Sequence, residues 1–359
     1  MKKAVSILFF FTVLSLGAQQ IINNGKTPQN KNAGRILKLN VDLRIAGDAD
    51  DYYYNGVNSL HFDTTGNIYI NDAWSSNVRA HLVKFSPEGK FLSDLYRQGE
   101  GPGEIQSMYD LVLSDKEVFV FDYMKRKIIV MEEDGTFVRE FKLVSDRLND
   151  LIGIFEDWLV FSRKDTPFDR KTSRLYDVNN VIVFVSKDGQ TVKDFFTFTN
   201  KQFFIASAQG GGGMGWDSFT TVIGDGKLYA CSSQEYLIEV LDLKTGQITS
   251  RFKRDYARIK HEMRDFEKKF ISKYSAPKRK FKNDIGGLFC VGGNLWIKTS
   301  TEDEEKGQMF DVFDTDSRFV DSFFVNTKGR IVKIDGDFIY SSETDEDDLP
   351  FLIKYKIVN

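Results

Sequence analysis

Short apolar runs separated by polar turns recur along the whole chain and predict a protein built from β-strands. The clearest unit runs from Val57 to Ile105, where three apolar runs alternate with turns before a glycine-rich loop. Alternation of apolar and polar residues with a period of two is typical of half-buried strands. A short apolar run after a turn recurs six times, at 67–70, 117–120, 157–160, 227–230, 294–297 and 337–340.

Tight turns mark a second repeated feature, an outer hairpin in each unit. Such turns need residues that tolerate positive φ, and Asp-Gly and similar pairs supply them. Five turns of this kind occur, at 87–89, 133–135, 187–189, 244–246 and 314–317. The last unit has only three strands, whereas 34–45 alternates as a strand and has no hairpin partner beside it.

Placing 34–45 in the last unit completes six units of four strands. A ring closed in this way leaves no long exposed edge, as in β-propellers. We therefore predict an all-β, six-bladed β-propeller of four-stranded antiparallel blades, forming a single domain over 34–359. A parallel α/β fold would need a helix between successive strands. A β-sandwich would also give short strands, but it does not explain the repeated unit and its closure.

Three stretches interrupt the repeat, at 162–174, 198–218 and 255–285. Long irregular connections in a compact domain are often functional. The third stretch predicts an amphipathic helix at about 255–275, with Asp255 as its cap and Pro277 after its end. The apolar residues that recur at steps of three and four are Ile259, Met263, Phe266, Phe270 and Tyr274.

The N-terminus has the pattern of a signal peptide over 1–18. Lys2 and Lys3 precede an uncharged apolar run that ends in small residues, and we expect cleavage near Ala18. The run is shorter than a bilayer span requires, although a single-pass anchor remains the alternative. Residues 19–33 are polar and rich in asparagine, and we expect a disordered leader there. The mature protein is then expected to be exported, either periplasmic or secreted, with no membrane span.

The first unit carries a resemblance to a known type of repeat. The pattern Phe62-Asp-x-x-Gly-Asn-Ile-Tyr-Ile70 is followed by Lys84-Phe-x-x-x-Gly-x-Phe91, and the unit ends at Arg97-Gln-Gly-Glu-Gly-Pro-Gly-Glu-Ile105. This resembles an NHL-type repeat, and its ending is similar to that of exported six-bladed β-propellers common in Bacteroidetes. The resemblance implies the fold and an exported location. It does not imply one activity, because such propellers include scaffolds, ligand binders, lyases and hydrolases.

Composition narrows the possible partners. The formal net charge is −3, so bulk charge gives no reason to expect a nucleic acid as partner. Cys231 and Cys290 each lie in an apolar run and are expected to be buried thiols. Export would also permit a disulfide between them, and the sequence leaves that open.

Candidate catalytic and metal-binding chemistry is sparse. The three histidines, His61, His81 and His261, form no ligand cluster, and no G-x-S-x-G motif is present. We therefore name no catalytic residue and expect no cofactor. Calcium, which prefers oxygen ligands, is the one candidate ion, with Asp63, Asn67 and Asp72 as available ligands. Turn positions favour the same residue types, which is the simpler explanation of those three residues.

Candidate binding residues cluster at loops. Arg97, Gln98 and Glu100 lie in the loop between the first two units, where the glycines alone would explain how the chain crosses. Trp74, Trp216 and Asp217 are the remaining candidates, because an exposed tryptophan beside a carboxylate suits a sugar or a peptide. Burial of both tryptophans in the core is the alternative.

Charge is also uneven along the chain. The segment 251–282 is strongly basic, whereas 302–305 and 345–348 are acidic. Solvated faces would explain this pattern, and docking of an acidic partner or glycan is the functional alternative. We expect a module that binds a protein, peptide or glycan on one face of the ring. Alternatives are a lyase or hydrolase with a carboxylate-held metal at the channel mouth, and a structural partner in an envelope complex.

Overall fold

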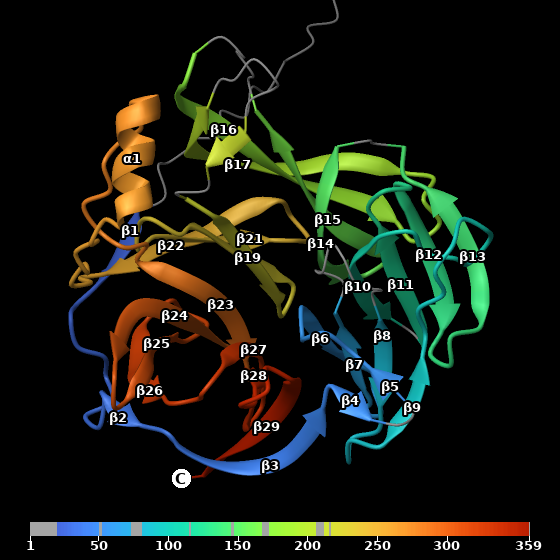
Figure 1. The fold of residues 1–359 in the computed structure, drawn as a ribbon. Helices are drawn as coiled ribbons and strands as arrows, with labels where there is room; N and C mark the ends of the chain where they lie inside the picture. The colour runs from blue at the N-terminus through green and yellow to red at the C-terminus, as the bar shows by residue number, and fades with distance from the viewer. Residues whose placement is uncertain are drawn as a thin grey trace, which may run out of the picture.

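The computed structural model describes residues 20–49, 52–72, 81–114, 116–144, 147–166, 172–205, 212–214 and 217–358. Among the described residues, six of the seven sheets contain a meander of four antiparallel strands, and these six are arranged around a central axis (Figure 1). Three of the six carry a fifth strand, and the seventh sheet has two strands. The six-bladed β-propeller predicted from the repeats is confirmed. The expected cleavage site and the residues before it, Trp74 and Trp216 all lie outside the described residues.

Each blade is a meander from an inner strand at the axis to an outer strand at the rim. The inner strands are β6 (Ser59–Phe62), β10 (Met108–Ser114), β14 (Leu148–Phe155), β19 (Phe219–Gly224), β23 (Ile285–Val291) and β27 (Arg330–Asp335). The second strands are β7 (Ile68–Asn71), β11 (Glu117–Asp122), β15 (Trp158–Asp165), β20 (Lys227–Ser232), β24 (Asn294–Asp303) and β28 (Phe338–Thr344).

The outer half of each blade is completed by a hairpin. The third strands are β8 (Leu82–Phe85), β12 (Lys127–Glu132), β16 (Arg174–Ser186), β21 (Ile238–Asp242), β25 (Gly307–Phe313) and β29 (Pro350–Val358). The outer strands are β9 (Phe91–Asp94), β13 (Phe137–Lys142), β17 (Val192–Ile205), β22 (Gln247–Arg254), β26 (Phe319–Val325) and β3 (Lys38–Ala46). Short additions are β1 (Ile21–Asn24), β2 (Arg35–Ile36), β4 (Asp48–Ala49), β5 (Tyr52–Tyr53) and β18 (Gly212–Met214).

The six apolar runs that revealed the repeat are the second strands of the blades. In blade one every residue of β7 and β8 is buried, whereas β6 is mostly half-buried. The middle strands of a blade pack against the neighbouring blade on both faces, so they can be apolar throughout. The inner strands lie at the axis and are less buried than the second strands. Their runs of apolar residues are therefore less regular.

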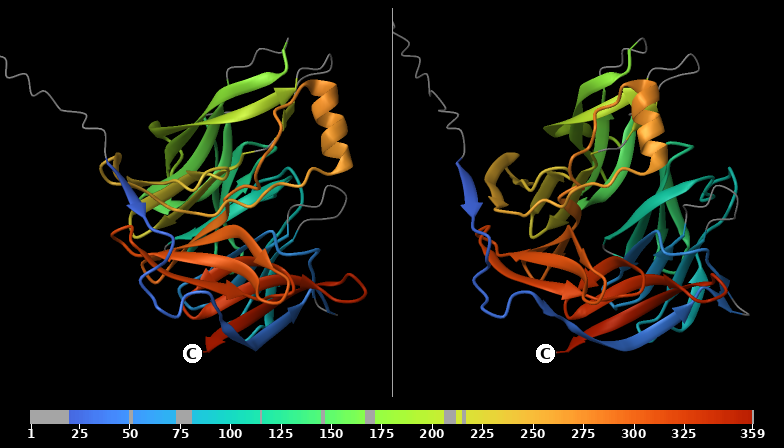
Figure 2. Two further views of the ribbon diagram at one scale, coloured as in Figure 1. Left: turned by 90° about the vertical axis from the view of Figure 1, so that its left-hand side faces the viewer. Right: turned by 60° about the vertical axis from the view of Figure 1, so that its left-hand side comes forward.

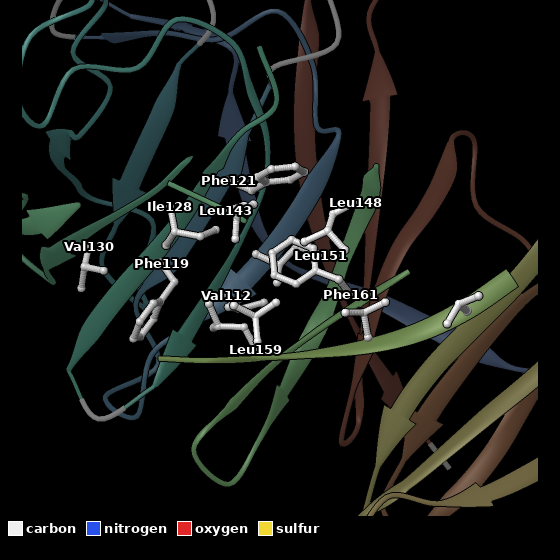
Figure 3. Packing of buried hydrophobic residues seen from close by; sticks show 13 residues of the cluster. Val112, Phe119, Phe121, Ile128, Val130, Leu143, Leu148, Leu151, Leu159 and Phe161 are labelled. Carbon is white, nitrogen blue, oxygen red and sulfur yellow. The ribbon is translucent and has the colours of Figure 1, made fainter. Parts of the chain in front are cut away.

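Six hydrophobic clusters lie one between each pair of neighbouring blades, and a seventh, smaller cluster lies outside this ring. Figure 3 shows the cluster between blades two and three, where Phe121 of β11 faces Phe161 of β15. Their ring centroids are 5.3 Å apart at an interplanar angle of 86°. Edge-to-face pairs of this kind add about 0.5–1.5 kcal/mol beyond the area they bury. Cys231 and Cys290 are free thiols, and burial raises the pKa of Cys290 to about 12.

The ring closes as the unpaired N-terminal strand predicted. Strand β3 pairs antiparallel with β29, from Phe351 opposite Ala46 to Val358 opposite Lys38. This sheet, in the order β27-β28-β29-β3, joins the two ends of the chain within one blade. Pairing the first strand with the last sheet lets side chains and backbone hydrogen bonds hold the ring shut.

The segment 19–33, expected to be a disordered leader, instead contains a strand. Residues Ile21–Asn24 form β1, which adds in parallel to the outer edge of blade four along β22. Further on, β2 adds in parallel to β26 of blade five. An outer strand exposes unpaired backbone groups, and a polar tail can pair with them without any apolar face of its own. The composition of the tail therefore gave the wrong expectation.

Blade three and the insertion after blade four rise above the ring. Strands β16 and β17 have 13 and 14 residues and extend as a hairpin beside α1 (Figure 2). The helix α1 spans Asp265–Tyr274. No helix in the described part of the chain is long and apolar enough to cross a membrane.

Candidate functional site

The insertions gather on one face of the ring, which we call the crossing face. On this face the chain passes from the outer strand of one blade to the inner strand of the next. Antiparallel order brings the connections between second and third strands to the same face. The predicted binding loop 97–105, the loop at 232–238 and the insertion 255–284 therefore share it.

The loop 97–105 satisfies its own polar groups. The backbone N–H of Ile105 donates to the carbonyl of Arg97 at 2.7 Å, and Glu104 Oε2 accepts from the N–H of Gly101 at 2.8 Å. Glu100 pairs with Lys125 at 3.0 Å. Arg97 and Gln98 are exposed. The loop joins blades one and two, on the other side of the ring from the insertion after blade four, so these candidates are not brought together with Asp217.

Asp217 is buried, and its carboxylate is held by neutral donors. Oδ2 accepts hydrogen bonds from Asn200 Nδ2 at 3.1 Å and from Ser232 Oγ at 2.6 Å. Oδ1 accepts from Ser233 Oγ at 3.2 Å and from the N–H of Gln234 at 3.4 Å. The carboxylate thereby ties the connection into blade four to the loop at 232–238. Its binding role stays a prediction.

A cavity of about 370 Å³ lies beside this loop, between the hairpin of blade three and the insertion 255–284. We call it the basic groove. Six of its lining residues are cationic, and apolar side chains and one amide complete it. The lining residues are Leu175, Lys201, Phe203, Gln234, Arg258, Pro277, Lys278, Arg279, Lys280, Phe281 and Lys282.

The positive charge of the basic groove is only partly compensated. Arg258 pairs with the buried carboxylate of Asp284 at 2.9 Å and lies over the ring of Phe281 at 4.7 Å. Arg279 donates to the neutral Asn283, and burial lowers the pKa of its guanidinium. The four lysines form no ion pair with any residue that the structure describes; they are Lys201, Lys278, Lys280 and Lys282.

The local fold explains how the insertion presents these cations. Lys260 and Phe281 form an antiparallel bridge, so the insertion folds back on itself. Beyond α1, Ala276 packs against Phe203 at the end of β17, together with Phe270, Ile271 and Tyr274 of the helix. This small apolar cluster fixes 277–282 against blade three. The cations consequently line a hollow between the hairpin of blade three and the insertion 255–284.

The helix is shorter than predicted, because it begins at Asp265 and Asp255 is not its cap. The N–H of Arg264 donates to Glu267 Oε2 at 2.8 Å at the start, and Ser275 ends the helix in a left-handed conformation with φ 53°. Pro277 follows the end as expected. Phe266, placed on the apolar side by its spacing, is 53% exposed. Residues 259–261 instead run alongside 280–282, which spacing alone did not reveal.

The histidines do not form a catalytic or metal-binding centre together. His61 Nε2 lies 3.1 Å from both Asp110 Oδ1 and Ser59 Oγ. A nucleophile and its orienting carboxylate use opposite ring nitrogens in a Ser-His-Asp site, so this geometry does not match one. Within the described ranges, no group of three or more His, Cys, Asp or Glu side chains is placed to hold a metal ion.

The residues considered for calcium are separated by a strand. Asp63 and Asn67 share the turn before β7, where Asn67 Nδ2 donates to Asp63 Oδ2 at 2.8 Å, whereas Asp72 follows the other end of β7. The ammonium of Lys84 lies 3.3 Å from Asp63 and already provides a positive charge there. These three residues therefore do not converge on one site.

Sequence reasoning missed two residues that line the site. Lys201 stands in an alternating strand and Gln234 in a short loop, and neither has a local signal. The basic segment 251–282 and the interruption at 198–218 pointed to this region, but neither singled out these two side chains. The fold brings the three segments together from blade three, blade four and the insertion.

Comparison with known proteins supports the architecture. The model of a family described as a 6-bladed β-propeller matches residues 49–209. A protein from Bacteroides fragilis described as exported has a similar structure, with 13% identity, a TM-score of 0.53, and coverage of 95% of this chain and 100% of that one. A member of the duf4221 family from Bacteroides vulgatus is similar at 12% identity, with a TM-score of 0.52 and coverage of 90% and 99%.

No curated protein sequence matches this chain. At such low identities the structural matches show the fold alone, and function has to be argued from the site. By fold, then, this chain is a six-bladed β-propeller that is similar over nearly its whole length to proteins of Bacteroides.

Proposed function

We propose that this protein is an exported binding module whose basic groove binds an anionic ligand. The observation that carries the proposal is the set of four lysines that line one hollow without a carboxylate partner among the described residues. A protein of net charge −3 has carboxylates in excess, so uncompensated cations gathered in a concave site favour a ligand that supplies the missing charge.

The lining of the groove supports binding rather than catalysis. Among its described lining residues there is no histidine, cysteine, serine or carboxylate, so lysine is the one side-chain type there that can act as a nucleophile or general base. Its apolar members, among them Leu175, Phe203 and Phe281, provide the walls that small-molecule sites typically have.

Export is part of the proposal. The signal-peptide pattern over 1–18 supports it, and so does the description of the Bacteroides fragilis protein as exported. In a periplasmic or extracellular setting, the available anionic ligands include acidic glycans and acidic segments of proteins. Both carry carboxylate, sulfate or phosphate groups that lysine recognises.

Isothermal titration calorimetry with heparin oligosaccharides and with poly-glutamate tests the proposal. The double variant Lys278→Gln/Lys280→Gln is expected to weaken binding of both probes about 5- to 30-fold, because each lost contact contributes roughly 0.5–1 kcal/mol. Higher salt should weaken binding to the unmodified protein, because screening reduces the attraction.

The matched control is Lys90→Gln/Lys244→Gln, which removes the same charge from two exposed hairpin turns of blades one and four. This control should bind like the unmodified protein. Equal affinities for all three proteins, or no binding of either polyanion, would remove the basic groove as the site.

A further inference from the structure

A second cavity, of about 310 Å³, adjoins the basic groove, and the two share Lys201 and Gln234. We call it the adjoining cavity. Its members come from the outer strand of blade three, from the connection into blade four, and from the first three strands of blade four with the loop between the second and third. It is lined by Phe198, Thr199, Asn200, Lys201, Asp217, Phe219, Cys231, Ser232, Gln234, Glu235, Leu237 and Glu239.

The adjoining cavity differs chemically from the groove. Hydroxyl and amide groups stand between apolar walls, and the shared Lys201 is the only cation among its described lining residues. Its buried carboxylate, Asp217, is already held by neutral donors. At its margin Glu239 pairs with Arg251 at 2.7 Å, whereas Glu235 is exposed and forms no ion pair with a described residue.

This contrast determines which end of a ligand lies in the basic groove and which end lies in the adjoining cavity. An anionic group is attracted by Lys278, Lys280 and Lys282 in the groove, but a second anionic group in the adjoining cavity would meet Glu235. A carboxylate accepts hydrogen bonds and donates none. Glu235, with the amide oxygen of Gln234 and the hydroxyl of Thr199, therefore favours a neutral ligand portion that offers several O–H donors.

We propose that the ligand is an acidic oligosaccharide in which one charged sugar adjoins a neutral sugar. The charged sugar, a uronic or sulfated residue, lies in the basic groove, and the neutral sugar lies in the adjoining cavity. Pyranose rings also present C–H faces, which Phe219 and Leu237 can contact. A peptide offers one N–H donor per residue and matches this density of acceptors less well. The inference rests on the proposed function, since it assumes that an anion occupies the groove.

Calorimetry with four small probes tests the inference. The probes are cellobiouronic acid, with one charged and one neutral sugar; digalacturonic acid, with two charged sugars; neutral cellobiose; and the peptide acetyl-Glu-Ser-Ser amide. Cellobiouronic acid is expected to bind at least about fivefold more tightly than each of the others, because it alone satisfies both cavities.

The variant Glu235→Gln removes the repulsion between this carboxylate and a second charged sugar. It therefore tests whether Glu235 causes the preference for a neutral sugar in the adjoining cavity. It should reduce the preference for cellobiouronic acid over digalacturonic acid at least about threefold. The matched control Glu346→Gln removes an exposed carboxylate from blade six and should leave the preference unchanged. A readout of relative affinity separates this effect from any loss of stability.

The outcomes distinguish the two proposals. If both acidic sugars bind equally and Glu235→Gln changes nothing, the mixed oligosaccharide is overturned while anion binding in the groove stands. Tighter binding of the peptide would also overturn it, in favour of an acidic protein segment. If no acidic probe binds better than cellobiose, the proposed function itself fails.

Discussion

Polar pairs join neighbouring blades of this propeller, and the pair of Asp63 and Lys84 is the clearest case. The carboxylate of Asp63 accepts hydrogen bonds from Thr65 and Asn67 within its turn and lies 3.3 Å from the ammonium of Lys84. Lys84 also donates to the carbonyl of Glu133 in blade two at 2.9 Å. Burial opposes the charge on Asp63, but these hydrogen bonds and Lys84 outweigh it and lower the pKa to about 2.

Replacing Asp63 by asparagine should destabilise the protein at neutral pH by about 2–4 kcal/mol. The side chain of Lys84 is only 9% exposed, so the substitution leaves a buried charge without its partner. Urea denaturation followed by tryptophan fluorescence measures the change. Asp157→Asn, at a side chain that is 96% exposed, is the control and should change little.

The pH dependence of this effect has a defined sign. The pKa of Asp63 is depressed in the folded state, so its contribution is complete above the unfolded value near 3.9 and is lost as the pH falls toward 2. The difference between the unmodified protein and Asp63→Asn should therefore shrink between about pH 4 and pH 2. A difference that stays constant over this range would contradict the role of the carboxylate charge.

At the scale of elements, the N-terminal segment acts as a strap on the outside of the ring. Strand β1 covers the edge of blade four, and β2 covers the edge of blade five. Asn24 joins the two blades, because its amide donates to the carbonyl of Ser317 at 3.0 Å and accepts from the N–H of Phe319 at 3.0 Å. The strap therefore protects two sheet edges before the chain enters β3.

Removal of β1 should weaken the fold without abolishing it. A chain that begins at Gly25 loses the pairing with β22 and the bonds of Asn24, and we expect a loss of about 1–3 kcal/mol. A chain that begins at Ile21 retains both and is the matched control. Thermal unfolding by circular dichroism compares the two. Equal midpoints would show that the strap rests on the blades without stabilising them.

At the scale of the whole molecule, stability depends on the seam where the two ends of the chain pair. On β3, Ile45 lies opposite Leu352 and is 2% exposed, within the cluster between blades six and one. Val41 lies opposite Tyr355 on the same strand and is 62% exposed. Strand β3 thus has one buried and one exposed side chain where it pairs with β29.

The substitution Ile45→Asp should open the seam and cost more than about 4 kcal/mol, because it buries a carboxylate among apolar side chains. Val41→Asp places the same group in solvent and should have little effect. Guanidinium denaturation measures both. Equal free energies of unfolding for the two variants would mean that the packing of β3 does not stabilise blade six.

The arrangement of the ring was readable in the sequence because each blade repeats the same local pattern. Second strands such as β7 and β11 are buried on both faces, so they stay apolar and can be counted. The alternating run before blade one lacked a neighbour, which predicted its pairing with the last blade. Residues Ile21–Asn24 were misjudged, since pairing to an existing sheet edge needs no apolar pattern.

The candidate site is different, because it depends on residues that are distant along the chain. The basic stretch around Lys278–Lys282 was visible as charge, but charge alone also describes a solvated face. Lys201 and Gln234 had no pattern that could assign them to it. The local periodicity that identifies a strand says nothing about which loops meet above the ring.

The sequence by itself determined the number of blades, their strand order and the closure of the ring, because local periodicity and turn chemistry act over a few residues. Only the tertiary structure decided that the hairpin of blade three and the insertion after blade four enclose one groove. It also decided which cations there lack a carboxylate partner among the described residues. Whether a charge is compensated depends on distances across the fold, and those distances are set by packing between segments far apart in sequence.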